Sequence, residues 1–340
     1  MSRARPAWTP PMRDGVSASR VAVTPGPWRT VLDFLVHRLS TISETGWRER
    51  LGRGEVLDAQ GLALAAEAPC VVHSTLWYWR TLDAPEPRIP FEVEVLHQDD
   101  WLLAVDKPHF LPMTPKGRYV QETLLVRLKR LTGIETLVPM HRLDRETAGV
   151  VLFSVRPETR HAYQSMFRDR VIHKVYEAVA PWSDALAATL PLERRSRLAE
   201  REDAFMQMHE VDGEPNAVTR IELIERHGPL ARYRLTPQTG QKHQLRVHLN
   251  ALGIPIVGDR IYPVLQPDLL PGAEPDYTEP LRLLAREIAF TDPVTGEARR
   301  FASRRGLRVD GPAQVSDRHA SPALSSASIT SAARARLAPT

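Results

Sequence analysis

The stretch HRLDRETAGVVLFSV, at residues 141–155, places a cluster of charged residues directly before an apolar run. Val150 to Val155 has the length and composition typical of a strand that is buried on both faces. A loop carboxylate that is anchored by such a strand is held rigidly near apolar surroundings, which can control its protonation and reactivity. The stretch therefore predicts a functional loop around Asp144. The alternative from this segment alone is a charged surface turn that happens to precede a strand.

Length and cysteine content limit the class of protein. A chain of 340 residues can bury a sizeable core and divide into two domains with tails. The single cysteine, Cys70, excludes an internal disulfide and a multi-cysteine zinc site, which fits a reducing compartment. No apolar run approaches membrane-spanning length, and the N-terminus has no signal-peptide core. We therefore expect a cytoplasmic protein that does not bind membranes.

The positive net charge of +4 is concentrated at the two ends of the chain. Residues 1–29 hold five arginines and one aspartate, and residues 311–340 hold three arginines and one aspartate. Residues 30–310 therefore carry a net charge of −2. Global charge is no argument for nucleic-acid binding here, and only local clusters of arginine can support it.

Composition and hydrophobic periodicity divide the chain into four parts. Residues 1–29 are rich in proline and arginine and predict a disordered leader, and residues 311–340 predict a disordered, Ala/Ser-rich tail. Residues 30–84 predict a small unit of two short helices and a hairpin, followed by a proline-rich linker. Residues 91–305 predict the main domain, whose strands alternate with helices and hairpins. This pattern indicates an α+β fold.

A second group of polar residues lies in the predicted helix at 239–253. His243, Arg246 and Asn250 share one face by their spacing, opposite a leucine stripe. The turn at 239–242 offers backbone amides beside Lys242, a combination that suits a phosphate group. A solvated helix face is the alternative interpretation.

A tyrosine on the predicted strand 174–180 is the third candidate. Tyr176 lies on the same face as Ala178 and Ala180. A tyrosine among small residues is usually core packing, but it could also present its ring to a base and its hydroxyl to a proton. His243 and His248 are five residues apart, which is wrong for two metal ligands on one helix face, so we expect no metal.

Four segments resemble, in order, the motifs of RluA-type pseudouridine synthases, over about residues 91–305. They are VDKPHFLP (105–112), HRLDRETAGVVLF (141–153), KVYEAVA (174–180) and TGQKHQLRVHLNALGIPIVGDRIYP (239–263). Two departures stand out. The usual Thr-Gly-Arg-Thr is Thr-Gly-Gln-Lys at 239–242, which moves a phosphate contact to Lys242, and the usual Thr-Ser-Gly is Thr-Ala-Gly at 147–149.

The resemblance implies a fold, an activity and a partner. The fold would be a mixed, mainly antiparallel sheet flanked by helices, and residues 30–84 would be a divergent RNA-binding domain of the alpha-L type. The activity would be isomerisation of a specific uridine to pseudouridine in ribosomal or transfer RNA. The family implies no metal and no nucleotide or redox cofactor. We expect a monomer whose partner is RNA.

The resemblance also assigns roles to residues. Asp144 would be the catalytic carboxylate, either as a nucleophile or by taking a ribose proton, and Arg246 would pair with it. Tyr176 would stack on the flipped uracil and could accept the carbon 5 proton. Arg142 would enter the space that the flipped nucleotide leaves or hold its backbone. The other expected substrate contacts are His141, Lys107, Lys242 and His243. Two alternatives are an inactive RNA-binding protein of the same fold and a carboxylate-dependent glycoside hydrolase, which would need a second catalytic carboxylate.

Overall fold

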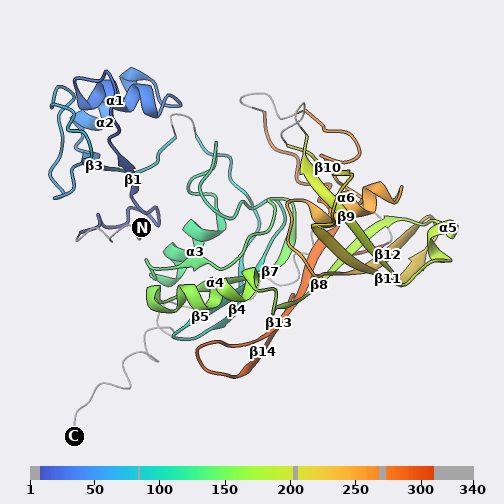
Figure 1. The fold of residues 1–340 in the computed structure, drawn as a ribbon. Coiled ribbons are helices and arrows are strands. Elements are labelled where there is room, and N and C mark those ends of the chain that lie inside the picture. Colours follow the sequence, from blue (N-terminus) through green and yellow to red (C-terminus); the bar gives the residue numbers. More distant parts are fainter. Residues whose placement is uncertain (1–7, 83–84, 202–205, 268–272, 310–340) are drawn as a thin grey trace, which may run out of the picture.

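The computed structural model describes residues 8–82, 85–201, 206–267 and 273–309. Figure 1 shows a small N-terminal unit, drawn in blue, beside a larger part built on one long sheet. We call residues 19–82 the N-terminal unit. The predicted tail at 311–340 lies outside the described residues.

The N-terminal unit combines two short helices with a three-stranded sheet of order β1-β3-β2. Its elements are β1 (Ser19–Ala22), α1 (Val31–Arg38), α2 (Glu44–Gly52), β2 (Val56–Leu57) and β3 (Thr75–Tyr78). Thr30 and Ser43 cap the two helices by accepting bonds from backbone N–H groups in their first turns. The unit has its own apolar core, in which Phe34, Leu35 and Trp47 have no exposed surface.

The prediction of a disordered leader at 1–29 is wrong for the part that the structure describes, which begins at residue 8. Ser19 to Ala22 form β1 and pair with β3, some 55 residues further along the chain. Pro11, which precedes β1, is also held in place: its carbonyl oxygen accepts a hydrogen bond from the ring N–H of Trp79 over 3.2 Å. Many prolines lower the chance of a helix, but they do not prevent an extended segment from packing on a partner that lies far away in sequence.

The larger part is built on an 11-stranded sheet, mostly antiparallel, with the order β10-β9-β11-β12-β8-β13-β7-β5-β4. In addition, β14 pairs with β13, and β6 pairs with β7. Among the strand pairs of the described residues, only β13–β7 is parallel. The strands are β4 (Glu94–Gln98), β5 (Leu102–Lys107), β6 (Val138–Pro139), β7 (Ala148–Ser154), β8 (His173–Pro181), β9 (Leu192–Glu200), β10 (Met208–Val211), β11 (Ala217–His227), β12 (Leu230–Pro237), β13 (Leu283–Thr291) and β14 (Ala298–Ala302).

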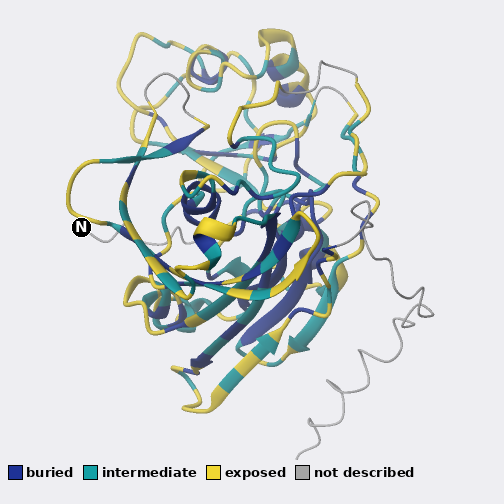
Figure 2. Cartoon of the chain, turned by 90° about the vertical axis from the view of Figure 1, so that its right-hand side faces the viewer, coloured by how far each residue is buried: buried dark blue, intermediate teal, exposed yellow. Residues whose placement is uncertain are grey.

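Helices cover both faces of this sheet. They are α3 (Leu124–Thr132), the 3₁₀ turn η1 (Pro157–Thr159), α4 (Arg160–Arg168), α5 (Asp184–Ala187) and α6 (Gln244–Ala251). On β7, alternate residues face two different cores: Val151 packs in the core under α3, and Leu152 packs in the core under α4. Every residue of β7 is buried, as predicted for a strand covered on both faces. Figure 2 shows buried strands, in dark blue, at the centre of the molecule.

Candidate active site

The Asp144 loop, residues 144–149, is tied closely to the middle of the sheet. Leu143 is buried in the core below it, and the Thr147 N–H closes the turn onto the Asp144 carbonyl oxygen over 3.2 Å. Gly149 ends the loop with a φ of +114°, and a Cβ at this position would lie 2.2 Å from the Ala285 carbonyl oxygen of β13. Only glycine permits this conformation and this approach. The loop therefore enters β7 in one fixed direction.

Arg246 of α6 reaches the Asp144 loop from the other half of the sheet. Its Nη1 lies 3.2 Å from Oδ2 of Asp144. The Arg246 side chain is 1 % exposed, whereas that of Asp144 is 23 % exposed. Burial alone would lower the pKa of Arg246, but hydrogen bonding and charge from Asp259, followed by the charge of Asp144, raise it above its ordinary value. The guanidinium is therefore a permanent cation beside Asp144.

Asp259 holds the opposite side of the same guanidinium, and sequence reasoning did not single it out. Its two oxygens accept bonds from Nε and Nη2 of Arg246 over 2.8 and 2.6 Å, and it also accepts the N–H groups of Ile261 and Tyr262. Its side chain is 1 % exposed. A bidentate, buried pair of this kind fixes the orientation of the arginine. The one sequence feature that could have indicated Asp259 is its place in the motif at residues 239–263.

His243 and Tyr262 complete the wall around Asp144. His243 precedes α6 in a left-handed conformation, with φ of 56°, and its Nε2 lies 3.8 Å from Oδ2 of Asp144. Its Nδ1 lies 3.1 Å from the Tyr262 hydroxyl. Burial lowers the pKa of His243, and the charge of Asp144 opposes this fall. Burial also raises the pKa of Tyr262 to about 12, so its hydroxyl stays protonated at neutral pH.

Tyr176 of β8 lies where the two halves of the core meet. It packs against both the cluster under α3 and the cluster under α6. Burial raises the pKa of its hydroxyl, and the negative charge of Asp144 adds to this rise. The structure therefore brings Asp144, Arg246 and His243 together, and Tyr176 lies near the Asp144 loop, because Ala285 of β13 pairs with Tyr176 on one side and with Gly149 on the other.

Lys107 lies under the Asp144 loop and has no exposed surface. Its ammonium donates to the carbonyl oxygens of Pro108, Leu111 and Arg145, over 3.0, 2.8 and 3.0 Å. Burial lowers its pKa to about 7, which the charges of Glu146 and Asp144 oppose. All three donors of the ammonium are used within the protein, so this position supports the loop from below rather than facing a ligand.

His141 is also engaged inside the protein. The Leu152 N–H donates to its Nε2 over 3.1 Å, and its ring stacks on Phe167. Burial, followed by the charge of Lys174, lowers the pKa of His141 to about 3, which keeps the imidazole neutral. Its neighbour Arg142 is exposed and makes no hydrogen bond or ion pair with another described residue.

The predicted helix at 239–253 begins later than expected, at Gln244. Thr239 to His243 form a turn instead, because the Gln244 side chain accepts the Gln241 N–H over 3.1 Å and the Thr239 hydroxyl over 2.6 Å. The Gln241 amide that was expected to face a phosphate is therefore already bonded. Lys242 is exposed at this turn and pairs with Glu200 over 3.1 Å.

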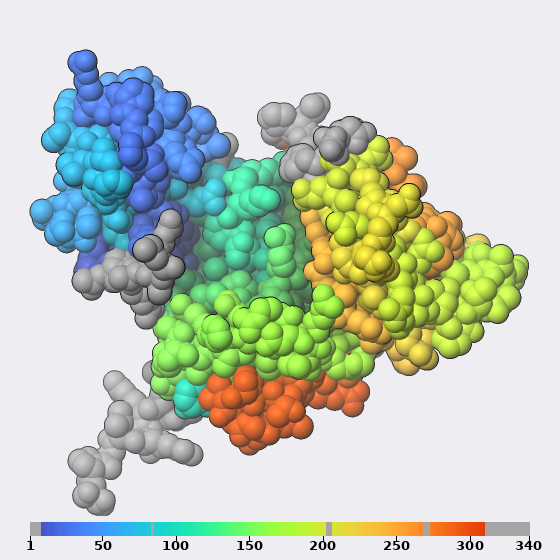
Figure 3. Space-filling view, in the orientation of Figure 1, coloured from blue at the N-terminus to red at the C-terminus, as the bar shows by residue number. Residues whose placement is uncertain are grey.

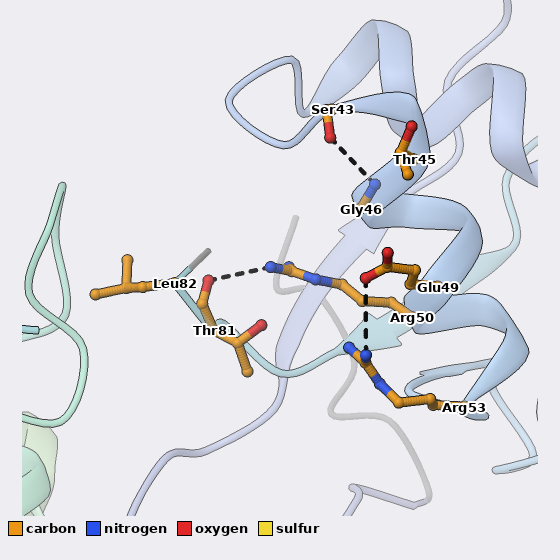
Figure 4. Close-up of a pocket in the computed structure, with 8 residues that line it drawn as sticks. All are labelled: Ser43, Thr45, Gly46, Glu49, Arg50, Arg53, Thr81 and Leu82. Carbon is orange, nitrogen blue, oxygen red and sulfur yellow. Dashed lines mark hydrogen bonds and ion pairs between the residues drawn. The ribbon is translucent and has the colours of Figure 1, made fainter. Parts of the chain in front are cut away.

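Two other kinds of site are missing from the parts of the chain that the structure describes. No group of three His, Cys, Asp or Glu residues there could hold a metal ion. None of the described helices has the length and apolar character needed to cross a bilayer. A cavity of about 450 Å³ lies in the N-terminal unit beside α2, lined by Ser43, Arg50, Arg53 and Thr81 among others (Figure 4). It contains none of the residues around Asp144.

Comparison with known proteins matches this arrangement to one family. A family profile described as RNA pseudouridylate synthase matches residues 101–251, which include Asp144, Tyr176 and Arg246. The chain is 30 % identical over 232 residues to the Synechocystis RNA pseudouridine synthase slr1592, covering 68 % of this chain and 79 % of that protein. It is also 30 % identical over 220 residues to the dual-specificity RNA pseudouridine synthase RluA of Haemophilus influenzae, covering 62 % of this chain and 93 % of that one.

The chain belongs to the RluA-type RNA pseudouridine synthases. A tRNA pseudouridine synthase C of Salmonella typhi is a further relative, 32 % identical over 222 residues, which are 60 % of this chain and 82 % of that protein. The human RNA pseudouridylate synthase domain containing 1 has the same fold, with a TM-score of 0.52 and 19 % identity, over 75 % of this chain and all of that one. The predicted α+β pseudouridine synthase fold and isomerase activity are therefore confirmed.

Proposed function

We propose that this pseudouridine synthase uses Asp144 as its catalytic carboxylate on a specific uridine in ribosomal or transfer RNA. One observation carries the proposal. Asp144 is the partly exposed acid of a pair that shares Arg246, while the other acid, Asp259, is buried and fully bonded. Asp144 is thus both paired with a buried cation and open to a substrate.

The reaction needs an ionised carboxylate at the ribose. The N1–C1′ bond of uridine breaks, its electrons stay on the uracil, and the uracil turns so that carbon 5 bonds to C1′. Carbon 5 then loses its proton, and N1 takes one up. Asp144 either attacks C1′ and is later displaced, or removes a ribose proton that is afterwards returned; both routes stay open. No atoms are gained or lost, so the reaction requires no oxidant and no co-substrate.

Tyr176 supplies a surface for the flipped uracil in this proposal. Its ring lies between two core clusters, where a base can stack on it. Its raised pKa keeps the hydroxyl protonated at neutral pH, so we assign it packing and hydrogen-bond donation rather than removal of the carbon 5 proton. Arg246 and His243 hold Asp144 in place, and Lys107 and His141 support the loop from inside.

Arg142 and Lys242 are proposed to contact the RNA. Arg142 is exposed and has no acidic partner among the described residues, and it lies two residues from Asp144. It can enter the space that a flipped nucleotide leaves. Lys242 can exchange its exposed pair with Glu200 for a phosphate. The names of relatives include both a dual-specificity RluA enzyme and a tRNA enzyme, which supports ribosomal or transfer RNA as the substrate class.

The remaining expectations are part of the same proposal. The enzyme is proposed to act as a cytoplasmic monomer, with residues 30–84 as a divergent RNA-binding domain, residues 91–305 as the catalytic domain, and no metal or organic cofactor. The arrangement disfavours a glycoside hydrolase, which needs two working carboxylates. Asp259 is bonded to Arg246 and two backbone amides, and Glu146 pairs with Arg145 over 2.7 Å.

The test is a map of pseudouridines in ribosomal and transfer RNA from cells with the gene, without it, and with Asp144→Asn in its place. We expect at least one position to lose its pseudouridine in both the deletion and the Asp144→Asn strain, and to regain it with the native gene. A position that Asp144→Asn still modifies at native level would contradict the role of Asp144. No change at any position in the deletion would contradict the substrate class.

A further inference from the structure

A short basic turn stands beside the active site and is separate from the residues that surround Asp144. Residues 107–121 contain two lysines and one arginine but no acid. Lys116 and Tyr119 exchange two backbone hydrogen bonds, Lys116 N–H to Tyr119 O over 3.0 Å and Tyr119 N–H to Lys116 O over 3.2 Å. Gly117 and Arg118 therefore form a two-residue turn, and residues 116–118 are exposed. We call residues 116–118 the basic turn.

The backbone on which the basic turn stands is held firmly. Tyr119 and Val120 are 6 % and 3 % exposed. The next three backbone N–H groups, of residues 120–122, all donate to the Glu86 carboxylate over 2.7 to 2.8 Å. A ligand that binds the turn therefore has little backbone to order, which removes part of the usual entropic cost.

The basic turn lies between the N-terminal unit and the Asp144 loop. Arg80, at the end of the N-terminal unit, donates from Nη1 to the Pro115 carbonyl oxygen over 2.8 Å. On the other side, the guanidinium carbons of Arg118 and Arg145 lie 5.4 and 5.9 Å from the centre of the Tyr119 ring. Arg145 directly follows Asp144. Figure 3 shows the teal and green surface of this region set back between the blue N-terminal unit and the yellow strands.

The charges on the turn lack acidic partners. Neither Lys116 nor Arg118 makes a hydrogen bond or an ion pair with the side chain of another described residue, whereas Arg145 pairs with Glu146. Two guanidinium groups that share one ring repel each other, and an anion between them converts this repulsion into attraction. Phosphate suits such a site because arginine and lysine both bind it well.

We propose that the basic turn binds backbone phosphates of the RNA strand that passes from the N-terminal unit into the Asp144 site. This proposal rests on the proposed function in one respect, which is that the bound anion belongs to RNA. It assigns Lys116 and Arg118 to holding the strand outside the reacting uridine. They therefore change how tightly RNA binds and leave the chemical step as it is.

The experiment measures binding of an unmodified transfer RNA transcript to the full chain across a salt titration. The variant is Lys116→Ala with Arg118→Ala, and the charge-keeping pair Lys116→Arg with Arg118→Lys tests whether charge is the cause. The matched control is Arg226→Ala, because Arg226 is also exposed and lies over an aromatic ring, Trp182, at 4.4 Å, at the far end of β11.

We expect the double alanine variant to bind about tenfold more weakly at low salt and to lower the slope of log affinity against log salt by about 1 to 2, as two lost phosphate contacts require. Its KM should rise with kcat unchanged. The charge-keeping pair and Arg226→Ala should retain the native slope. A native slope in the double alanine variant would overturn the proposal, and so would an equal loss in the charge-keeping pair. If the native protein makes no pseudouridine, the proposed function fails, but the salt slope still decides whether the turn binds phosphate.

Discussion

Asp144 and Asp259 bind the same arginine from two different loops, and the contrast between them explains the site. Both loops approach the start of β13, and each does so through a glycine: a Cβ on Gly149 would meet the Ala285 carbonyl oxygen at 2.2 Å, and one on Gly258 would meet that of Pro280 at 2.2 Å. The Asp259 carboxylate is saturated, with four hydrogen bonds and 1 % exposure.

Asp144 makes a single bond to Arg246 and keeps 23 % of its side chain exposed. The difference separates two tasks that a sequence motif does not distinguish. A carboxylate whose lone pairs are all in use orients its neighbour, and one with lone pairs to spare can react. Arg246 takes part in both tasks. Asp259 fixes the orientation of its guanidinium, and the positive charge of that group lies beside Asp144.

Removing Arg246, the cation that both acids share, should have the largest effect on stability and on activity. Arg246→Met leaves Asp259 as an unpaired buried charge, so we expect the free energy of unfolding to fall by about 3–5 kcal/mol, together with loss of activity. Urea unfolding followed by circular dichroism measures the first, and pseudouridine formation measures the second. Arg282→Met, at another buried arginine directly before β13, is the control, because Nη1 of Arg282 donates to the Arg308 carbonyl oxygen rather than to Asp144 or Asp259. If Arg246→Met were as stable as the native chain, the ion pair between Arg246 and Asp259 would not be holding the two loops together.

Changing the saturated acid should cost stability and geometry rather than chemistry. Asp259→Asn weakens two hydrogen bonds to Arg246, so we expect a loss of about 2 kcal/mol in the free energy of unfolding. Activity should fall by about tenfold to a hundredfold, because Arg246 and Asp144 lose their alignment. The checks are urea unfolding and a single-turnover rate. If Asp259→Asn were as inactive as Asp144→Asn while remaining as stable as the native chain, the two tasks would be wrongly assigned.

Gly149 tests how far the Asp144 loop depends on its close approach to β13. Gly149→Ala must shift the backbone, because of the 2.2 Å contact with Ala285 and the positive φ, and we expect a loss of about 2 kcal/mol or more. Gly253→Ala is the matched control, since Gly253 also has a positive φ of 77° but has no atom within 4 Å of the added Cβ. Equal losses of thermal stability in both variants would mean that the approach to β13 is unimportant.

Acid should destabilise the support under the Asp144 loop. Burial lowers the pKa of His109 to about 4, and its Nδ1 donates to the Glu146 carbonyl oxygen over 2.6 Å. The folded pKa is below the ordinary value of 6.5, so the unfolded chain takes up more protons between these values. Stability should therefore fall as the pH drops from about 6.5 to about 4, by up to about 1.4 kcal/mol per pH unit for this residue. Urea titrations at pH 7, 6 and 5 measure it, and His109→Gln should show a shallower fall. An identical pH dependence in both chains would count against a neutral His109.

Local patterns predicted the parts of the fold that are set locally. The apolar run after the Asp144 loop predicted a strand covered on both faces, and β7 is buried along its length. The family motifs indicated Asp144, Tyr176 and Arg246 on three separate segments, and in the structure Arg246 contacts Asp144. Asp259 lies within the last motif, but its sequence position does not mark it as a site residue, because its role depends on a bidentate contact with Arg246 that no local spacing reveals.

Long-range pairing and burial explain the other differences. β1 forms because β3 offers a partner that composition near residue 20 cannot indicate. A lysine beside a predicted site is expected to meet the substrate, yet Lys107 is enclosed by three carbonyl oxygens, an environment that depends on the loop's final path. The helix at α6 begins late because Gln244 bonds Thr239 and Gln241, which a helical pattern of leucines does not show.

The most direct test of the central claim compares single-turnover pseudouridine formation by Asp144→Asn, Asp259→Asn and the native chain on the RNA identified by mapping, with unfolding free energies measured on the same preparations. We predict that Asp144→Asn loses activity by about 10³-fold or more while its stability and RNA affinity stay close to native. Near-native turnover by a well-folded Asp144→Asn variant would contradict the account.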